Sequence, residues 1–260
     1  MKRFTIVSKN DDLSNQIRHK IHDALAKMDF ICDENDPELV IAIGGDGTFL
    51  RTIHKYVNAL DALLFVGIHT GTLGFFTSYD SHEVDKFLED CKQMKFVRKN
   101  LPLLEINVHS SKETHCLYAL NEIRVENVIR TQLMRIYVEN VFLETFRGTG
   151  ICISSQAGSS AYNRSLGGAI LHEGLDLLQI TEITGIHHQA YRSLGSPLIV
   201  PHDVTIRLES DDFCEAILCY DHESMKLRKD SCVTVNYSKK VVQMIGRPDT
   251  HYIERLKNLF

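Results

Sequence analysis

The amino-acid sequence predicts an α/β domain with a parallel sheet, followed by an all-β domain. Two observations predict this order. In the first hundred residues, short apolar runs alternate with segments in which apolar residues recur every three or four positions, a pattern typical of βαβ units. After Asn100-Leu101-Pro102, apolar residues instead alternate with polar ones, which favours antiparallel strands packed as a sandwich.

Three buried strands are expected in the first part, at 4–8, 39–43 and 63–68. Each precedes an amphipathic helix, marked by apolar stripes within 13–28, 49–57 and 84–91. Asp80 or Ser81 could cap the third of these helices. Strands alternating with helices place helices on the faces of a parallel sheet.

In the second part, period-two alternation predicts strands within 104–108, 134–138, 204–208 and 233–237. One helix is expected between them, at about 161–184. The last dozen residues are expected to be helical, with Tyr252, Ile253, Leu256 and Leu259 on one face. The predicted domains are therefore 1–100 and 101–248, followed by a C-terminal helix at 249–260.

Composition excludes several classes of protein. The 260 residues carry 29 Lys and Arg against 34 Asp and Glu, a net charge of −5, and no basic run predicts a nucleic-acid partner. No apolar run is long enough to predict a membrane span, and the first residues lack a signal-peptide pattern. The seven cysteines are dispersed, which is typical of reduced thiols. A cytoplasmic protein is expected.

The sharpest motif is Gly44-Gly45-Asp46-Gly47-Thr48, where a buried strand meets a helix. Glycines and helix amides at the carboxyl end of a parallel strand suit a phosphate ligand. A carboxylate repels neighbouring phosphates, so its presence here indicates a specific role. It either accepts a proton from a substrate hydroxyl or helps to place Mg²⁺. The alternative is a plain turn in which Asp46 caps the helix. The motif is neither a Walker A loop nor a G-x-G-x-x-G turn.

Two further features lie downstream. The loop from Gly67 to Phe75 contains three glycines, which predicts either a second close-approach loop or a flexible connection. Asn121 and Glu122 stand side by side in a strand-like run, so one of them should leave the solvent side for a pocket. The alternative is an exposed polar pair on a sheet edge.

A serine-rich segment, Gly158 to Ser165, precedes Gly167-Gly168. Its hydroxyls and amides suit a nucleotide at the start of a helix, or else simply cap that helix. His187 and His188 are adjacent, so they cannot both point at one metal ion, and no protein metal ligand is predicted. Asp221-His222 is expected to be a turn, unless the second domain points it at a ligand.

Together these features resemble the NAD kinase family, whose pattern is a G-G-D-G-T loop, an Asn-Glu pair, and a serine-rich segment ending in Gly-Gly. All occur here in order, and the resemblance continues through Phe146-Arg147-Gly148 and the segment 196–201. The loop alone also occurs in lipid kinases and phosphofructokinases. The combination is specific, and the resemblance covers most of the chain.

The resemblance implies a Rossmann-like α/β domain, to which the C-terminal helix returns, and a β-sandwich that binds NAD. It implies transfer of a phosphoryl group from ATP or polyphosphate to the 2′-hydroxyl of the adenosine ribose, with Mg²⁺, in a homodimer or homotetramer. Asp46 would be the general base, and Tyr162 a stacking surface. The resemblance places the nucleotide site at Gly45, Gly47, Thr48, Phe75, Asn121, Glu122, Arg147, Thr149, Ala157, Ser160, Ala161, Tyr162, Asn163, Arg164, Ser165 and His222.

The sequence departs from the family pattern at three places. Thr149 stands where an Asp is common, Ser155-Gln156 where Thr-Pro is common, and Ser160 where Thr is frequent. Thr149 offers a hydroxyl but no carboxylate, which puts substrate affinity in doubt rather than reaction type. A lipid kinase and a nucleotide-binding regulator with little turnover are the alternatives.

Overall fold

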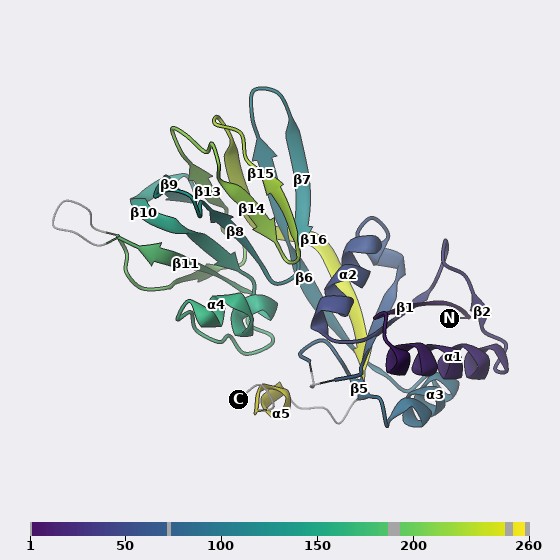
Figure 1. Ribbon diagram of the computed structural model, residues 1–260. Coiled ribbons are helices and arrows are strands. Elements are labelled where there is room, and N and C mark those ends of the chain that lie inside the picture. Colours follow the sequence, from purple (N-terminus) through teal and green to yellow (C-terminus); the bar gives the residue numbers. More distant parts are fainter. Residues whose placement is uncertain (1, 72–73, 187–192, 248–251, 258–260) are drawn as a thin grey trace. The chain divides into compact units, whose positions relative to one another are not determined.

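The computed structural model describes residues 2–71, 74–186, 193–247 and 252–257 (Figure 1). The chain forms two compact units, one made of Met1–Leu101 with Lys240–Phe260 and the other of Pro102–Lys239. The chain passes back from the second unit to the first between Lys239 and Lys240, within strand β16 (Cys232–Gly246). The sequence predicted this boundary between 248 and 249. One continuous strand serves both units, so its alternation carries no mark of the boundary.

The first unit contains a parallel sheet in the order β5-β4-β3-β1-β2. The end of β16 also pairs with β4 in parallel, at Gln243 and Met244. The three longer strands match the predicted ones, whereas β2 and β5 have two residues each and leave no sequence pattern. The strands are β1 (Arg3–Ser8), β2 (Ile31–Cys32), β3 (Leu39–Ile43), β4 (Leu64–His69) and β5 (Tyr79–Asp80).

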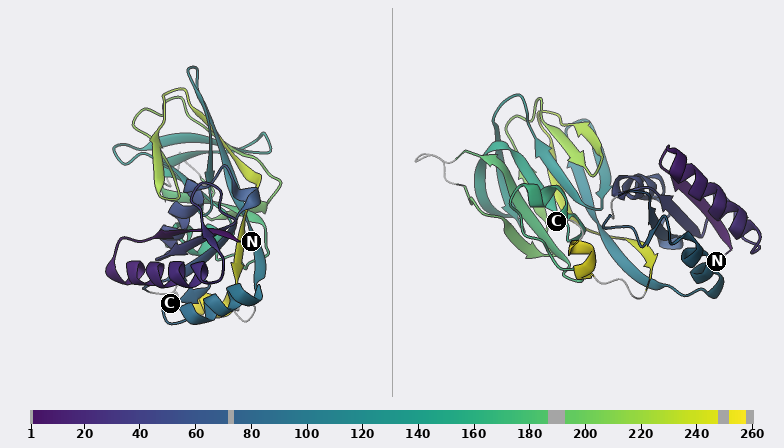
Figure 2. Two further views of the ribbon diagram at one scale, coloured as in Figure 1. Left: turned by 90° about the vertical axis from the view of Figure 1, so that its right-hand side faces the viewer. Right: turned by 60° about the horizontal axis from the view of Figure 1, so that its bottom comes forward.

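Helices cover both faces of this sheet (Figures 1 and 2). Helices α1 (Asp12–Ala26) and α3 (Val84–Gln93) pack together with one face of β3 in a single apolar core. Helix α2 (Asp46–Lys55) lies on the other face, where Phe49 stacks on Phe76 at 5.5 Å. The prediction of three helices is confirmed, and a short 3₁₀ helix η1 (Leu60–Ala62) follows α2. Glu83 is the residue before α3, and Asp80 instead accepts amides of the preceding turn.

The second unit is built mostly of antiparallel strands around its own apolar core, which confirms the predicted all-β class. Strand β10 pairs with β9 along its first half and with β8 and β11 along its second half. The strands are β6 (Val97–His109), β7 (Thr114–Ala119), β8 (Glu122–Glu126), β9 (Gln132–Val138), β10 (Val141–Ser154), β11 (Leu177–Gly185), β12 (Leu198–Pro201), β13 (Ile206–Glu209), β14 (Ile217–Tyr220), β15 (Glu223–Lys226) and the first part of β16.

The predicted helix at 161–184 is wrong. Only α4 (Tyr162–Ser165) is helical within this range, directly after the 3₁₀ helix η2 (Ala157–Ser160), and 177–185 is strand β11. Gly167 and Gly174 have φ of 82° and 87°, a left-handed conformation that ends a helix. The apolar spacing of 175–183 therefore belongs to a strand whose one face is buried in the core.

The C-terminal helix α5 spans Tyr252–Lys257. Tyr252 is buried and Leu256 half-buried, as the predicted face requires, whereas Ile253 is 59% exposed and Arg255 is buried instead. Leu259, His187 and His188 lie outside the described residues.

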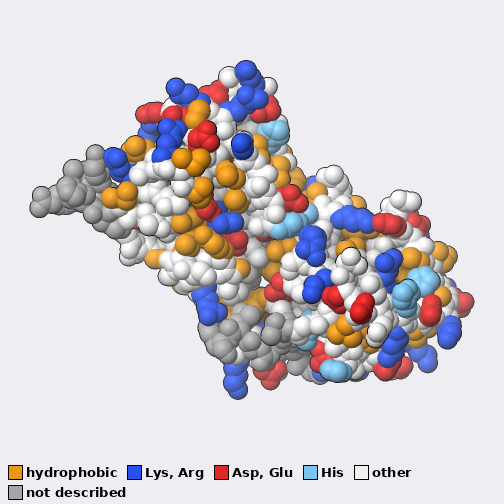
Figure 3. Space-filling model, in the orientation of Figure 1, with side chains coloured by type: hydrophobic (Ala, Val, Ile, Leu, Met, Phe, Trp, Pro, Cys, Tyr) orange, Lys and Arg blue, Asp and Glu red, His pale blue; other side chains and the backbone are white. Residues whose placement is uncertain are grey.

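Among the described residues, none of the helices is both long and apolar enough to cross a membrane. On the molecular face shown in Figure 3, acidic and basic side chains are interspersed. This face therefore offers no broad basic surface to a phosphate-bearing ligand.

Candidate functional site

The first unit gathers the glycine-rich motif at the carboxyl ends of β3 and β4. Strand β3 ends at Ile43, and α2 begins at Asp46 with Gly45 as its N-cap residue. Gly44 has a φ of 151°, and a Cβ there would lie 2.4 Å from Thr48 Oγ1. This position therefore requires glycine, and the tight turn exposes the first amides of α2.

The Asp46 carboxylate does not cap its own helix. Its Oδ2 accepts the Phe75 amide at 2.8 Å, and its Oδ1 accepts the Phe76 amide at 2.9 Å. A Cβ on Gly74 would lie 2.2 Å from Asp46 Oδ1, so the glycine leaves the space that the carboxylate occupies. The interpretation of Asp46 as a helix cap is therefore wrong. The second glycine loop holds the carboxylate, and each oxygen keeps a further lone pair for a ligand.

A cavity of about 340 Å³ lies beside this motif. It combines helix-start amides with two cationic side chains, a combination that suits a phosphate group. Its lining residues are Lys9, Gly45, Gly47, Thr48, Arg51, Thr70 and Gly71. Thr72 and Leu73 of the same loop lie outside the described residues. The Phe75 ring does not line this cavity and instead contacts Tyr252 of α5, with 5.5 Å between the ring centres.

In the second unit, Asn121 and Glu122 lie where the chain turns from β7 into β8. Both are buried, with 8% and 6% of their surfaces exposed. The alternative of an exposed pair is therefore wrong, and both residues, rather than one, leave the solvent side. Asp221, in the turn between β14 and β15, explains this conformation. Its carboxylate accepts the Leu120 amide at 2.8 Å and the Asn121 amide at 2.7 Å.

The serine-rich segment closes over the same turn. Ser155 Oγ donates to Leu120 O at 2.6 Å and accepts the Gly158 amide at 3.1 Å. A Cβ on Gly158 would lie 2.1 Å from Asn121 O, so this approach requires glycine. Sequence reasoning missed Asp221, Ser155 and Gly158 as supports, because each acts through contacts distant in sequence.

Two buried oxygens at this turn have no partner among the described residues, namely Asn121 Oδ1 and Glu122 Oε2. A buried acceptor without a donor costs about 1–3 kcal/mol, so both oxygens suit a ligand with neighbouring donors. Burial raises the pKa of Glu122 to about 7, the Asp221 carboxylate adds to this, and Arg124 opposes it. A donor that binds the carboxylate would favour its ionised form.

Glu122 belongs to a polar face of the sheet. Ser154 and Gln179 lie in register with it, and Arg124 lies in register with Cys152 and Thr181. The opposite face carries Ile123, Ile153 and Ile180, which belong to the apolar core. One face of these strands thus packs into the apolar core, and the other face presents polar side chains.

The remaining predicted residues fall into two groups. Ala157, Ser160, Ala161 and Tyr162 lie in or beside η2 and α4, in the segment that closes over the polar face. Asn163 is fully buried and engaged by the protein, accepting from Thr181 Oγ1 at 2.7 Å and donating to Ser159 O. Arg164 and Ser165 are exposed. His222 adjoins Asp221, and its ring lies 3.3 Å from the carboxylate of Glu223.

Arg147 and Thr149 are not brought together with Glu122. Glu122 pairs with Ser154 at one end of the β8–β10 ladder, whereas Asn127, just past β8, donates its amide to Thr149 O at the other end. Ser154 lies five positions after Thr149 along the strand, a distance of roughly 17 Å. One ribose within one chain therefore cannot contact both Thr149 and Glu122.

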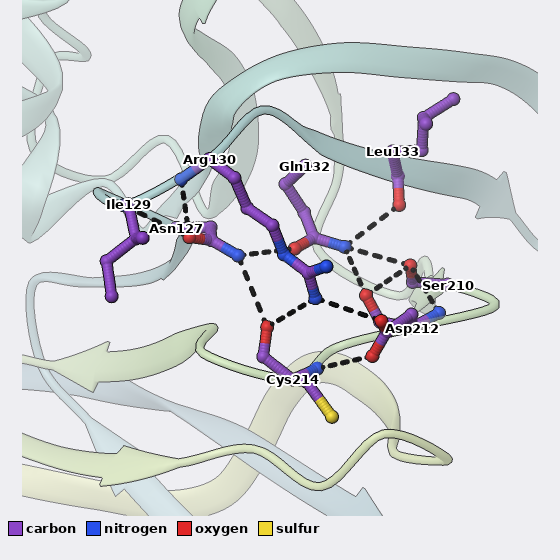
Figure 4. A network of polar contacts seen from close by, with 8 residues as sticks. All are labelled: Asn127, Ile129, Arg130, Gln132, Leu133, Ser210, Asp212 and Cys214. Carbon is purple, nitrogen blue, oxygen red and sulfur yellow. Dashed lines mark hydrogen bonds and ion pairs between the residues drawn. The ribbon is translucent and has the colours of Figure 1, made fainter.

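A saturated polar network holds that far end (Figure 4). Asn127 Oδ1 accepts two amides of the following turn. The two hydrogens of Gln132 Nε2 are shared among Ser210 Oγ, Asp212 O and Leu133 O, which lie 2.9–3.1 Å away. A cavity of about 250 Å³ adjoins the network, and the Arg130 guanidinium beside it pairs with Asp212 at 2.9 Å. None of the predicted site residues lines this cavity. No group of three or more His, Cys, Asp or Glu side chains suited to a metal occurs in the described part of the chain.

Comparison with known proteins decides what these motifs belong to. Residues 7–96 match the ATP-NAD kinase N-terminal domain, and residues 120–246 match the ATP-NAD kinase C-terminal domain. The chain belongs to the NAD kinase family. It is therefore a phosphotransferase with the function of an NAD kinase, which confirms the resemblance drawn from the motifs and excludes the lipid kinase alternative.

Relatives in the NAD kinase family match almost the whole chain. An NAD kinase of Latilactobacillus sakei is 34% identical over 260 residues, covering 99% of this chain and 97% of its own length. An NAD kinase of Geobacillus stearothermophilus is 39% identical over 225 residues, covering 85% of this chain and 83% of its own length.

Two solved structures share the fold. Yeast NADH kinase in complex with NADH has a TM-score of 0.84 at 19% identity, covering 99% of this chain and 86% of the yeast chain. The NAD kinase of Archaeoglobus fulgidus in complex with ATP has a TM-score of 0.77 at 18% identity, covering 99% and 98%. Both confirm an α/β N-terminal domain joined to a mostly antiparallel β domain.

Proposed function

We propose that Asp46 is the general base of this NAD kinase and takes the proton from the 2′-hydroxyl of the adenosine ribose. The observation that carries this is the seating of its carboxylate on the amides of Phe75 and Phe76. A carboxylate that does not cap its helix and is held next to a cavity with amide and cationic lining supports a role in accepting a proton. Phosphoryl transfer depends mostly on such positioning.

The Asn121 amide oxygen and the Glu122 carboxylate hold the nucleoside of NAD. Their unpartnered oxygens accept hydrogen bonds from a ribose diol or from an exocyclic amine. Ala157, Ser160, Ala161 and Tyr162 complete this part of the pocket, with the Tyr162 ring as a stacking surface. Tight packing around these groups would orient the 2′-hydroxyl before reaction.

Arg147 and Thr149 act on the other end of the dinucleotide or on a second copy of the chain. Their separation from Glu122 along β10 supports this assignment. We therefore propose a homodimer or homotetramer, in which one copy contributes these residues to its neighbour. His222, beside the Asp221 turn, is assigned to the nucleoside end.

The phosphoryl donor is ATP or polyphosphate, received by the cavity that Gly45, Gly47 and Thr48 line with Lys9 and Arg51. Mg²⁺ fits this site as an ion carried mainly by phosphate oxygens and water, because it rarely needs a cage of protein ligands and Asp46 offers a single carboxylate. When bound, the ion neutralises the charge of the phosphates. All seven cysteines are free, which supports a cytoplasmic location.

One assay tests the proposed function. Purified protein is incubated with ATP, Mg²⁺ and NAD, and NADP is read out with an NADP-specific dehydrogenase. Asp46→Asn should lower kcat by about 10² to 10⁴-fold, the usual contribution of a positioned base, while the Kd for NAD changes little. Near-normal turnover in Asp46→Asn would remove Asp46 as the base, and NAD binding without any NADP would restore the regulator alternative.

A further inference from the structure

Arg124 occupies a central place on the polar face of the second unit. It lies on β8 with Cys152 of β10 on one side and Cys219 of β14 on the other. Its guanidinium carbon lies 4.2 Å from the centre of the Tyr162 ring. Only 20% of its side chain is exposed, and such a desolvated contact between a guanidinium and an aromatic ring is strong.

The protein fixes this guanidinium from its other side. Arg124 Nη1 pairs with Glu126 Oε1 at 2.5 Å, and 13% of the Glu126 side chain is exposed. Gly150 makes room for Glu126, because a Cβ there would lie 3.0 Å from both Glu126 Cα and Cγ and 2.3 Å from Val125 O. Glu126 and Tyr162 therefore contact the Arg124 guanidinium from two sides, and these contacts restrict the orientation of the Tyr162 ring.

Arg124 also acts on Glu122, two residues earlier on the same face. The charged and titratable groups that face this carboxyl from the packed elements are Asp221, Arg124 and Cys152. Burial and the Asp221 carboxylate raise the pKa of Glu122, and the Arg124 charge lowers it. Without Arg124, the carboxyl would stay protonated to higher pH and would lose an acceptor for the ligand.

We propose that Arg124 is a positioning residue of the nucleoside pocket, which holds the Tyr162 ring in place for stacking and supports the Glu122 carboxylate by its positive charge. This inference rests on the proposed role of Asn121 and Glu122 in holding NAD. The two effects separate by substitution, since Arg124→Lys keeps the charge but loses the planar stack, and Arg124→Gln loses both.

The chain offers a matched control in β13. Arg207 pairs with Glu209, two residues later, and its guanidinium carbon lies 4.0 Å from the centre of the Tyr137 ring. This repeats the Arg-x-Glu pair and the tyrosine contact of Arg124 on a different strand, away from the polar face. Arg207→Gln therefore removes the same kinds of interaction without touching the Asn121–Glu122 pocket.

The experiment measures the Kd for NAD by calorimetry and kcat/KM for NAD from pH 6 to 9, for wild type and each variant. In wild type, affinity should rise with pH as Glu122 ionises. Arg124→Gln should move this rise to higher pH and weaken binding about tenfold at pH 7. Arg124→Lys should keep the midpoint but weaken binding about threefold to tenfold at every pH. Arg207→Gln should follow wild type.

A double-mutant comparison tests the path through Tyr162. If Arg124 acts by holding the ring, Arg124→Lys should have less than a twofold effect in a Tyr162→Ala background. An unshifted midpoint in folded Arg124→Gln, or equal effects of Arg124→Gln and Arg207→Gln, would overturn the inference. Absence of NAD binding by the wild type would instead overturn the proposed nucleoside site.

Discussion

Gly74→Ala should displace the carboxylate of Asp46, the proposed base, and so impair catalysis without changing Asp46 itself. A methyl group at this position would lie 2.2 Å from Asp46 Oδ1 and 2.7 Å from its Cγ, so the carboxylate has to move by about 1 Å to reach van der Waals contact. That movement weakens two hydrogen bonds to an ionised group, from the amides of Phe75 and Phe76, each worth about 1.5–3 kcal/mol. A misplacement of about 1 Å can cost roughly 10²-fold in rate.

We therefore expect kcat to fall about 30- to 300-fold, with less than a threefold change in KM for NAD, in the coupled NADP assay. Circular dichroism and thermal unfolding check that the fold persists.

The double variant Asp46→Asn with Gly74→Ala decides the cause. If Gly74 acts only through Asp46, the added methyl should lower kcat little further in the Asp46→Asn background. An equal loss in both backgrounds would refute the reasoning, as would a Gly74→Ala enzyme that keeps kcat within threefold of wild type.

Two further predictions concern the second unit. Thr149→Asp should lower KM for NAD by a factor of a few up to roughly 30, because a hydrogen bond to a charged group contributes more than a neutral one. The change in kcat should be smaller, and steady-state kinetics test both values. A raised KM would mean that an unpartnered carboxylate repels the phosphates. For Glu122, a raised pKa of about 7 against an ordinary 4.5 means that the ligand-free fold binds the proton more tightly than the unfolded chain. Its contribution to stability is therefore complete below about pH 4.5 and is lost as pH rises to about 7, by up to about 3 kcal/mol. Thermal unfolding of wild type and Glu122→Gln at pH 5 and pH 7.5 should show the wild type losing stability relative to the variant, and equal changes in both would contradict this.

Local pattern was enough to predict the first unit and the family. Strand β3 is a continuous apolar run, β1 and β4 are mostly apolar, and α1, α2 and α3 carry apolar residues at helical spacing, so the burial of these residues favours the observed elements. The order of the motifs predicted the function, because the residue types in each motif are determined by the nucleotide chemistry that they perform.

Local pattern failed where a segment is shaped by partners distant in sequence. The segment 161–184 carries helical spacing, yet left-handed glycines break it and β11 pairs with β10 and β12. The short strands β2 and β5 exist only because a neighbouring strand offers its backbone groups. In each case hydrogen bonds across the sheet outweigh local propensity.

For the site, the sequence by itself determined which residues carry the chemistry, and only the tertiary structure decided what holds them. Asp46 is seated by amides 29 and 30 positions later, and Asn121 is turned inward by a carboxylate 100 positions away. The family resemblance assigned Thr149 and Glu122 to one nucleotide site, but they lie at opposite ends of the β8–β10 ladder. Spacing along a chain sets which residues can share a face of one helix or strand, but the closing of loops by hydrogen bonds between distant segments leaves no periodicity to detect.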